Sequence, residues 1–366
     1  MTPAAAAEPG RPFVIPVFIP YAGCPHRCVF CNQTEITQAE CGAGPSAAVR
    51  DGIEAFLKHK GPGRSTVQIA FYGGNFLGQA PDEICRLLDV AEGFVRSGDV
   101  DGIRFSTRPD TVTPDRLDLL APVSVDTVEL GVQSMDDGVL AASRRGHTAG
   151  EARSAVRRLK SRGLSVGLQL MVGLPGDSPE TSLRTTLTAA DLAPDFVRIY
   201  PTLVLKESRL ALWHRQGRYT PLSLEAAVDL VSRMYGVFMG RGIPVVRMGL
   251  QASSGLDDPE TVVAGPYHPA FGHLVLSELF LKCAAGLLAE RRQAAAPSTA
   301  AIEVHPRNIS RMRGLGNKNV EILKAMFHID KLKIIPNPAV STTAVRVERT
   351  DGIFGGAHGG CGLYER

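Results

Sequence analysis

The sequence lacks the features of a secreted or membrane-spanning chain. Its alanine-rich start, MTPAAAAEPG, has no basic segment. The apolar runs are far shorter than the roughly 20 residues that a membrane helix needs. We therefore expect no targeting segment, no membrane partner and a cytoplasmic protein.

A strong charge of either sign is also missing. Lysine and arginine number 40 against 37 aspartate and glutamate, a formal net charge of +3. This balance neither requires nor excludes a polyanionic partner. With 366 residues and 44% hydrophobic content, the chain can form one large domain of about 250 residues and a smaller appendage.

The seven cysteines do not form a disulfide framework, because their number is odd and three of them are clustered. Cys24, Cys28 and Cys31 follow an apolar run, Phe13 to Ile19. Thiolates this close together can bind one inorganic centre, and three ligands would leave one position open for another molecule. A zinc site with a distant fourth ligand is the alternative, although no second Cys-x-x-Cys and no closely spaced His pair accompanies the cluster.

Apolar strand patterns alternate with amphipathic helix patterns along most of the chain. Strands are expected at residues 13–19, 66–71, 103–106, 126–131, 165–172, 196–200 and 244–248, and helices at 45–60, 81–96, 114–120, 149–162, 179–190 and 224–239. This order favours an α/β fold, a partial TIM-like (β/α)6 barrel with a parallel sheet, over an open doubly wound sheet. The unusual loops all follow strands, at the edge where barrels carry their active sites.

The pattern changes after residue 250. We expect a disordered start (1–12), a core domain (13–250) and a core-completing loop, helix and linker (251–299). A small basic α/β appendage (300–350) and a flexible glycine-rich tail (351–366) follow.

The motif Cys24-x-x-x-Cys28-x-Phe30-Cys31 after the first strand resembles that of the radical S-adenosylmethionine (SAM) enzymes. The resemblance implies that the three cysteines hold three irons of a [4Fe–4S] cluster and that the fourth iron chelates SAM. Phe30 would pack near the adenine. An electron from a flavodoxin- or ferredoxin-like donor would cleave SAM to methionine and a 5′-deoxyadenosyl radical.

Later loops resemble the branch that contains the Elongator catalytic subunit and the oxygen-independent coproporphyrinogen dehydrogenases. The resemblance implies SAM contacts from the ends of successive strands, made by Gly73, Gly74, Asn75, Phe76, Arg108, Glu129, Gln133, Ser134, Arg145, Met171 and Gly173. Arg145, in an Arg-Gly-His-Thr element, would hold the SAM carboxylate through its forked guanidinium. Lys206 would act as a catalytic residue in the cavity.

Several of these residues have simpler interpretations. The Gly73-Gly74 segment can be a plain tight turn, Glu129 a buried hydrogen-bonded carboxylate, and Met171 core packing. His147 can cap the following helix, and Lys206 can be a solvated loop lysine.

The substrate stays open. Elongator subunits modify transfer RNA and carry an acetyltransferase domain, which we do not expect here. Residues 305–333 hold seven lysines and arginines against two acidic residues, which is compatible with RNA binding and equally with a solvated helix face. A radical SAM enzyme acting on RNA is the first hypothesis, the same chemistry on a small molecule such as a tetrapyrrole the second, and a non-enzymatic iron–sulfur or zinc module the third.

Overall fold

The computed structural model describes residues 12–19, 22–32, 44–61, 66–250, 256, 260–290, 299–349 and 360–362. The expected disordered start, except residue 12, and most of the expected tail lie outside these ranges. Within the tail, β13 (Gly360–Gly362) pairs antiparallel with β12 (Ala344–Arg349).

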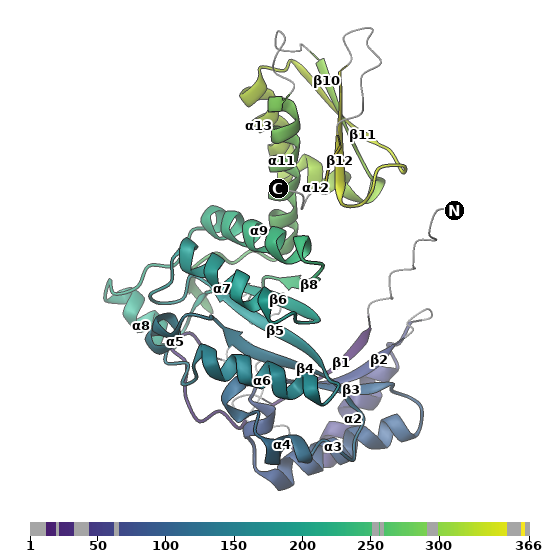
Figure 1. Cartoon of the computed structure of the whole chain (residues 1–366), viewed down its shortest axis with the longest axis vertical. Helices are drawn as coiled ribbons and strands as arrows, with labels where there is room; N and C mark the ends of the chain where they lie inside the picture. Colours follow the sequence, from purple (N-terminus) through teal and green to yellow (C-terminus); the bar gives the residue numbers. More distant parts are fainter. Residues whose placement is uncertain are drawn as a thin grey trace.

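A seven-stranded parallel sheet forms the body of the protein, in the order β1-β2-β3-β4-β5-β6-β8 (Figure 1). Its strands are β1 (Phe13–Phe18), β2 (Val67–Tyr72), β3 (Gly102–Thr107), β4 (Val125–Gln133), β5 (Ser165–Val172), β6 (Phe196–Pro201) and β8 (Val245–Met248). All seven strands expected from the sequence are confirmed. The curled sheet is a partial barrel, and its seventh strand, β8, extends the expected six-unit core.

The crossover helices cover one face of this sheet. They are α2 (Ser46–Leu57), α3 (Pro81–Arg96), α4 (Pro114–Asp118), α6 (Ala149–Ser161), α7 (Pro179–Asp191) and α9 (Leu224–Gly240). Two short helices, α5 (Asp137–Ala142) and α8 (Arg209–Arg215), are additions that the sequence pattern did not indicate. Helix α6 begins at a capping box formed by Thr148 and Glu151, so His147 does not cap it.

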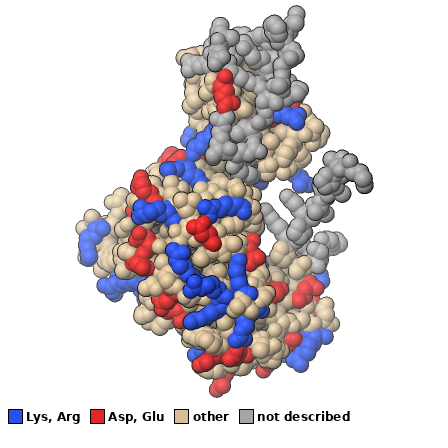
Figure 2. Space-filling view, viewed as in Figure 1, with Lys and Arg blue, Asp and Glu red and all other residues tan. Residues whose placement is uncertain are grey.

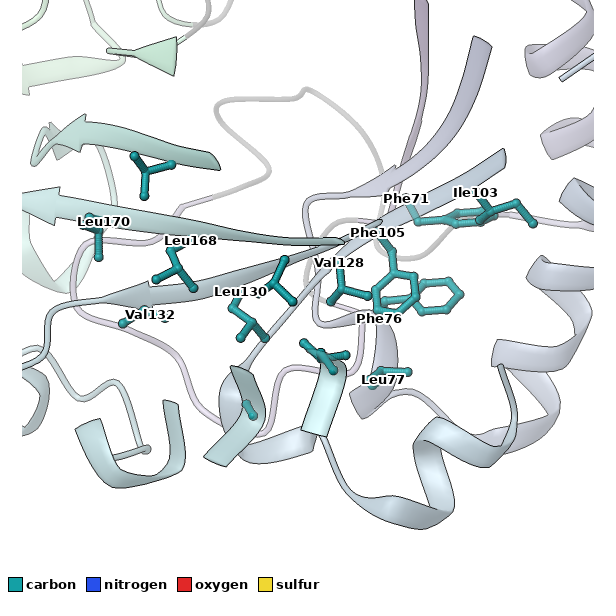
Figure 3. Packing of buried hydrophobic residues seen from close by; sticks show 14 of the residues in the cluster. Phe71, Phe76, Leu77, Ile103, Phe105, Val128, Leu130, Val132, Leu168 and Leu170 are labelled. Carbon is teal, nitrogen blue, oxygen red and sulfur yellow. The ribbon is translucent and has the colours of Figure 1, made fainter. Parts of the chain in front are cut away.

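Alternate residues of each strand form the apolar face that packs against these helices (Figure 3). Phe71, Phe105, Leu130 and Leu168 are fully buried in one cluster. Phe76 stacks between the rings of Phe71 and Phe105, with centroids 5.0 and 4.5 Å away. The Phe76 side chain therefore belongs to the core.

The other face of the sheet, which lines the inside of the partial barrel, is polar. Glu129, fully buried on β4, accepts hydrogen bonds from Tyr72 (2.8 Å), Arg104 (2.6 Å), Gln169 (3.1 Å) and Arg198 (3.0 Å). These donors come from β2, β3, β5 and β6, so one carboxylate ties five strands together. The simpler interpretation of Glu129, a hydrogen-bonded buried carboxylate, describes its contacts.

A long apolar helix, α11 (Phe271–Glu290), joins the sheet domain to the appendage (Figure 1). Phe271 and Val275 enter the main core, whereas Phe280 and Leu287 pack against the appendage. The appendage contains β10 (Thr299–Val304), α12 (Ile309–Arg313), α13 (Lys318–Phe327), β11 (Lys331–Pro336) and β12. Helix α11 has the length and mean hydropathy (1.5) of a membrane span, but its apolar surface is shared by two protein cores.

Candidate active site

The cysteine loop lies on the segment between α5 and α6. The Nη1 atom of Arg145 donates to Sγ of Cys28 at 3.3 Å, and the Val29 amide donates to the Ser143 carbonyl at 3.2 Å. A methyl group added to Gly146 would lie 2.3 Å from the His26 ring. The absence of a side chain at Gly146 therefore lets the loop approach closely.

The other side of the loop rests on the segment after β6. Asn32 donates to the Lys206 carbonyl at 2.6 Å, and the Val29 carbonyl accepts from the Leu210 amide at 2.8 Å. The Lys206 ammonium pairs with Glu260 at 2.9 Å. The catalytic role of Lys206 thus stays a prediction, while its backbone helps to position the cysteines.

The glycine-rich turn after β2 packs directly against the start of the cysteine loop. A methyl group on Gly74 would lie 2.4 Å from the Ile19 carbonyl oxygen and 2.6 Å from that of Ala22. At Gly23, where φ is +70°, it would lie 2.3 Å from the Asn75 carbonyl oxygen. Both positions therefore require glycine, and the close contact with this turn positions the cysteine loop relative to the sheet.

Asn75 links this turn to the end of β3. Its fully buried amide donates to the Gly23 carbonyl at 2.8 Å and accepts from Thr107 (2.7 Å), the Arg108 amide (2.9 Å) and Thr111 (2.9 Å). Its side chain is thus engaged with protein groups.

Two buried guanidiniums at the site keep nitrogen atoms without a hydrogen-bond partner in the described part of the chain. Arg108 forks onto Asp110 at 2.9 and 3.1 Å, but its Nη1 atom has no partner. Arg145 donates to Cys28 and to the Gly131 carbonyl, but its Nε atom has none. Buried donors normally find acceptors, so these two atoms fit an anionic ligand such as a carboxylate.

The three thiols fit an iron–sulfur cluster better than a single zinc ion. In the residues that the structure covers, no three His, Cys, Asp or Glu side chains converge on one ion. Zinc needs every sulfur within about 2.3 Å of the metal, whereas a [4Fe–4S] cluster binds each thiolate at a different iron. Burial and the neighbouring Cys28 and Cys24 raise the pKa of Cys31 to about 12, so its thiolate requires bound cations.

The end of β4 places its two polar residues differently. Gln133 adopts a φ of +68° at a bulge, with its amide beside Gly131 and close to the Arg145 guanidinium. The Ser134 hydroxyl instead lies 3.2 Å from the Thr185 hydroxyl of α7 and accepts from the Asp136 amide. Gln133 thus lies near the Arg145 guanidinium whereas Ser134 faces α7, and both stay predicted SAM contacts.

The remaining expected contacts lie on the cysteine loop, at the end of β5 and in the turn after β2. Phe30 packs partly buried beside α8, and Met171 is half-buried on the polar face of β5. Gly173 has a φ of +75°, and its carbonyl accepts from the Tyr219 hydroxyl at 2.6 Å. Gly73, with a φ of +99°, lies in the turn that supports the cysteine loop.

Sequence reasoning missed several residues of this site. Asn32 and Tyr219 anchor loops through single long-range bonds, and the motifs around them do not show which partners they have. Arg104 and Arg198 had a signal, because each is a charge inside an otherwise apolar strand. The short strands β7 (Val204–Leu205) and β9 (Val262–Ala264), which pair with each other, had no such signal in the sequence.

Comparisons with known proteins show which proteins this chain resembles. Residues 18–186 match the Radical SAM superfamily and residues 194–280 match the Radical_SAM C-terminal domain. The uncharacterized protein MJ0486 of Methanocaldococcus jannaschii is 30% identical over 230 residues, which are 60% of this chain and 70% of that protein. The tRNA uridine(34) acetyltransferase of Dehalococcoides mccartyi is 36% identical over 123 residues, 33% of this chain but only 27% of its own length.

Among solved structures, the N-terminally truncated Elp3 of Methanocaldococcus infernus has a TM-score of 0.58 at 23% identity, and the match covers 74% of this chain and 63% of that one. This likeness concerns the fold, a partial barrel with an added C-terminal part. The two matched families and the relative of which 70% is covered identify the chain. The protein is a member of the radical SAM superfamily, enzymes that use a [4Fe–4S] cluster and SAM.

Proposed function

We propose that this protein is a radical SAM enzyme that acts on RNA. Cys24, Cys28 and Cys31 would hold a [4Fe–4S] cluster, and the open donors of Arg108 and Arg145 would receive the SAM carboxylate. When bound, this cofactor pair supplies reductive cleavage of SAM to methionine and a 5′-deoxyadenosyl radical. The observation that supports the cofactor part is the contact of Arg145 with both Cys28 and Gly131, because it fixes a carboxylate-binding group beside a cluster ligand.

The protein's own residues orient these groups and exclude water. Gly74 and Asn75 set the position of the cysteine loop, and Arg145 bridges it to the end of β4. An electron donor of the flavodoxin or ferredoxin kind would supply the electron, and a cytoplasmic location would keep the thiols reduced.

RNA as the substrate is supported by an uncompensated basic surface on helix α6 (Figure 2). Arg153, Arg157, Arg158 and Lys160 are exposed there. Arg157 donates to the Ser154 hydroxyl and Arg158 to the Val112 carbonyl, and neither bond neutralises charge. Since α6 follows the Arg145 segment, this cationic surface leads away from the candidate active site and suits a phosphate backbone.

The appendage adds a second basic surface. Arg307, Arg313, Lys318, Lys331 and Lys333 are exposed between residues 305 and 333, where Glu321 and Asp330 are the acidic residues. Deleting this segment would be a poor test, because Phe280 and Leu287 of α11 are buried against it. Charge substitutions leave that core intact.

The cofactor part is tested by anaerobic reconstitution, reduction and addition of SAM. We expect 5′-deoxyadenosine from the wild-type protein and none from Cys28→Ala. Equal amounts from both would refute the proposed chemistry.

The RNA part is tested by the salt dependence of binding to total transfer RNA. Replacing Arg153, Arg157 and Lys160 with glutamine should lower the slope of log affinity against log salt by about 2 to 3, since each lost phosphate contact removes roughly 0.7 to 0.9. Arg86→Gln is the matched control, because Arg86 is already paired with Glu83. Turnover of a tetrapyrrole at full rate without RNA would instead establish the small-molecule hypothesis.

A further inference from the structure

Among the residues that the structure describes, the polar inner face of the sheet carries more positive charge than its carboxylates neutralise. Arg104 and Arg198 share the single carboxylate of Glu129. A second acidic residue, Asp126, lies at the opposite, amino-terminal edge, where it accepts two bonds from Gln68. Arg247, half-buried on β8, makes no hydrogen bond or ion pair with the described residues.

Strand register places Arg247 directly beside Arg198. The pairing of β6 with β8 sets Val197 opposite Val245, then Arg198 opposite Arg247, with a bulge between them. Val197 and Val245 both pack into the core, so the two arginines lie on the other face. Neighbouring strands are only about 4.8 Å apart, and like charges directly opposite each other are unfavourable.

A row of paired residues across neighbouring strands, called the register line below, connects Arg247 with the cysteine loop. Arg247 pairs with Arg198, Arg198 with Gln169, and Gln169 with Gly131, whose carbonyl is bonded to Arg145. Three strand spacings separate Arg247 from Gly131, roughly 14 Å along the curved sheet. A substrate that spans this distance would reach from the Arg145 side of the site to these guanidiniums.

A further unsatisfied donor lies on this face. Arg104 is 6% exposed, and its Nε atom has no hydrogen-bond partner in the described part of the chain. Its guanidinium lies over the Phe196 ring at 5.3 Å, which holds it in place. The helices of the sheet domain pack on the opposite face.

We propose that Arg247, with Arg198 beside it, binds an oxyanion group of the substrate inside the partial barrel. Guanidiniums bind phosphate and carboxylate through paired N–H donors, and an anion between the two arginines removes their mutual repulsion. The identity of the ligand rests on the proposed function. If the substrate is RNA, the oxyanion is an RNA phosphate. The pair then determines which substrates bind, without contacting SAM.

The test uses the reconstituted protein with SAM and measures the binding of ribonucleoside 5′-monophosphates and of the matching nucleosides by calorimetry. Wild type should prefer the monophosphate, and Arg247→Gln should lose about tenfold to a hundredfold of that affinity. Arg96→Gln, which removes an exposed arginine at the end of α3, should keep the preference. Arg96→Gln should also form as much 5′-deoxyadenosine as wild type without substrate.

Three outcomes separate the two proposals. Monophosphate binding that is equal in wild type and Arg247→Gln overturns the oxyanion site, whatever the result of SAM cleavage. An Arg247-dependent preference for a tetrapyrrole carboxylate over nucleotides supports the oxyanion site and overturns RNA as the substrate. Absence of SAM cleavage in wild type, with Arg247-dependent phosphate binding, overturns the proposed radical chemistry alone.

Discussion

Replacing Glu129 with glutamine should destabilise the protein strongly and change how its stability depends on pH. The carboxylate is fully buried and balances Arg104 and Arg198, while Tyr72 and Gln169 donate to it as well. Removing one partner of a buried ion pair costs about 3 to 5 kcal/mol, because the remaining charges have no compensation. We expect a loss of this size in the free energy of unfolding at pH 7.

The pH dependence follows from the direction of the shift. Burial alone would raise the pKa of Glu129, but Arg198 and Arg104 outweigh it and lower this pKa below the usual 4.5. A lowered acid pKa contributes stability above pH 4.5, and that stability is lost as the pH falls towards the folded-state pKa. Below pH 4.5 the wild type should therefore lose stability more steeply than Glu129→Gln.

Urea unfolding followed by far-ultraviolet circular dichroism between pH 3 and pH 8 measures both effects. Asp118→Asn is the control, because Asp118 pairs with Arg162 at the exposed surface and such pairs contribute less than about 1 kcal/mol. If Glu129→Gln is as stable as this control at pH 7, the carboxylate does not hold the inner face together.

Three further substitutions test the cysteine loop and the helix shared by the two cores. Gly74→Ala should lower the iron content after reconstitution, since its methyl group would lie 2.4 Å from the Ile19 carbonyl oxygen. Gly93→Ala is the control and should bind iron normally, because a methyl group there has no atom within 4 Å. Arg145→Lys should weaken SAM binding about tenfold or more at unchanged iron content, because lysine loses the forked geometry. Phe280→Ala should lower the free energy of unfolding, measured with heat or urea, by about 3 to 5 kcal/mol, since this ring is buried between α11 and the appendage. A loss below about 1 kcal/mol would mean that the two parts are stabilised independently.

Much of the fold could be predicted because its strands are short apolar runs separated by helices of regular period. Phe71, Leu130 and Leu168 alternate with residues of the other face, and this alternation alone places them in the core. Pairings between short, distant segments could not be predicted. β7 and β9 have two and three residues each and lie more than fifty residues apart, so their ladder depends on tertiary contacts.

The sequence predicts the candidate ligand residues of the site from local motifs, but it does not show which residues support their loops. The cysteine spacing and the glycine turn are local patterns, and the structure brings them together as expected. The resemblance implies that the segment of Asn75 contacts SAM through its backbone carbonyls, and the Asn75 side chain bonds to Gly23 and to the end of β3. Ser134 likewise faces α7. A polar residue in a motif does not reveal from sequence whether it contacts the ligand or holds the loop that does.

The register line from Gly131 to Arg247 has a consequence for substrate selection. Backbone hydrogen bonds fix each step of that line, and Glu129 ties its neighbouring strands, so the separation between the Arg145 side of the site and the oxyanion site is nearly rigid. A substrate must therefore match this separation, roughly 14 Å along the sheet, to place its reactive atom beside SAM while its anion binds Arg247. Arg247→Gln should then reduce the turnover of the true substrate more than its binding. A substrate that is not held by Arg247 stays at the site without the required alignment.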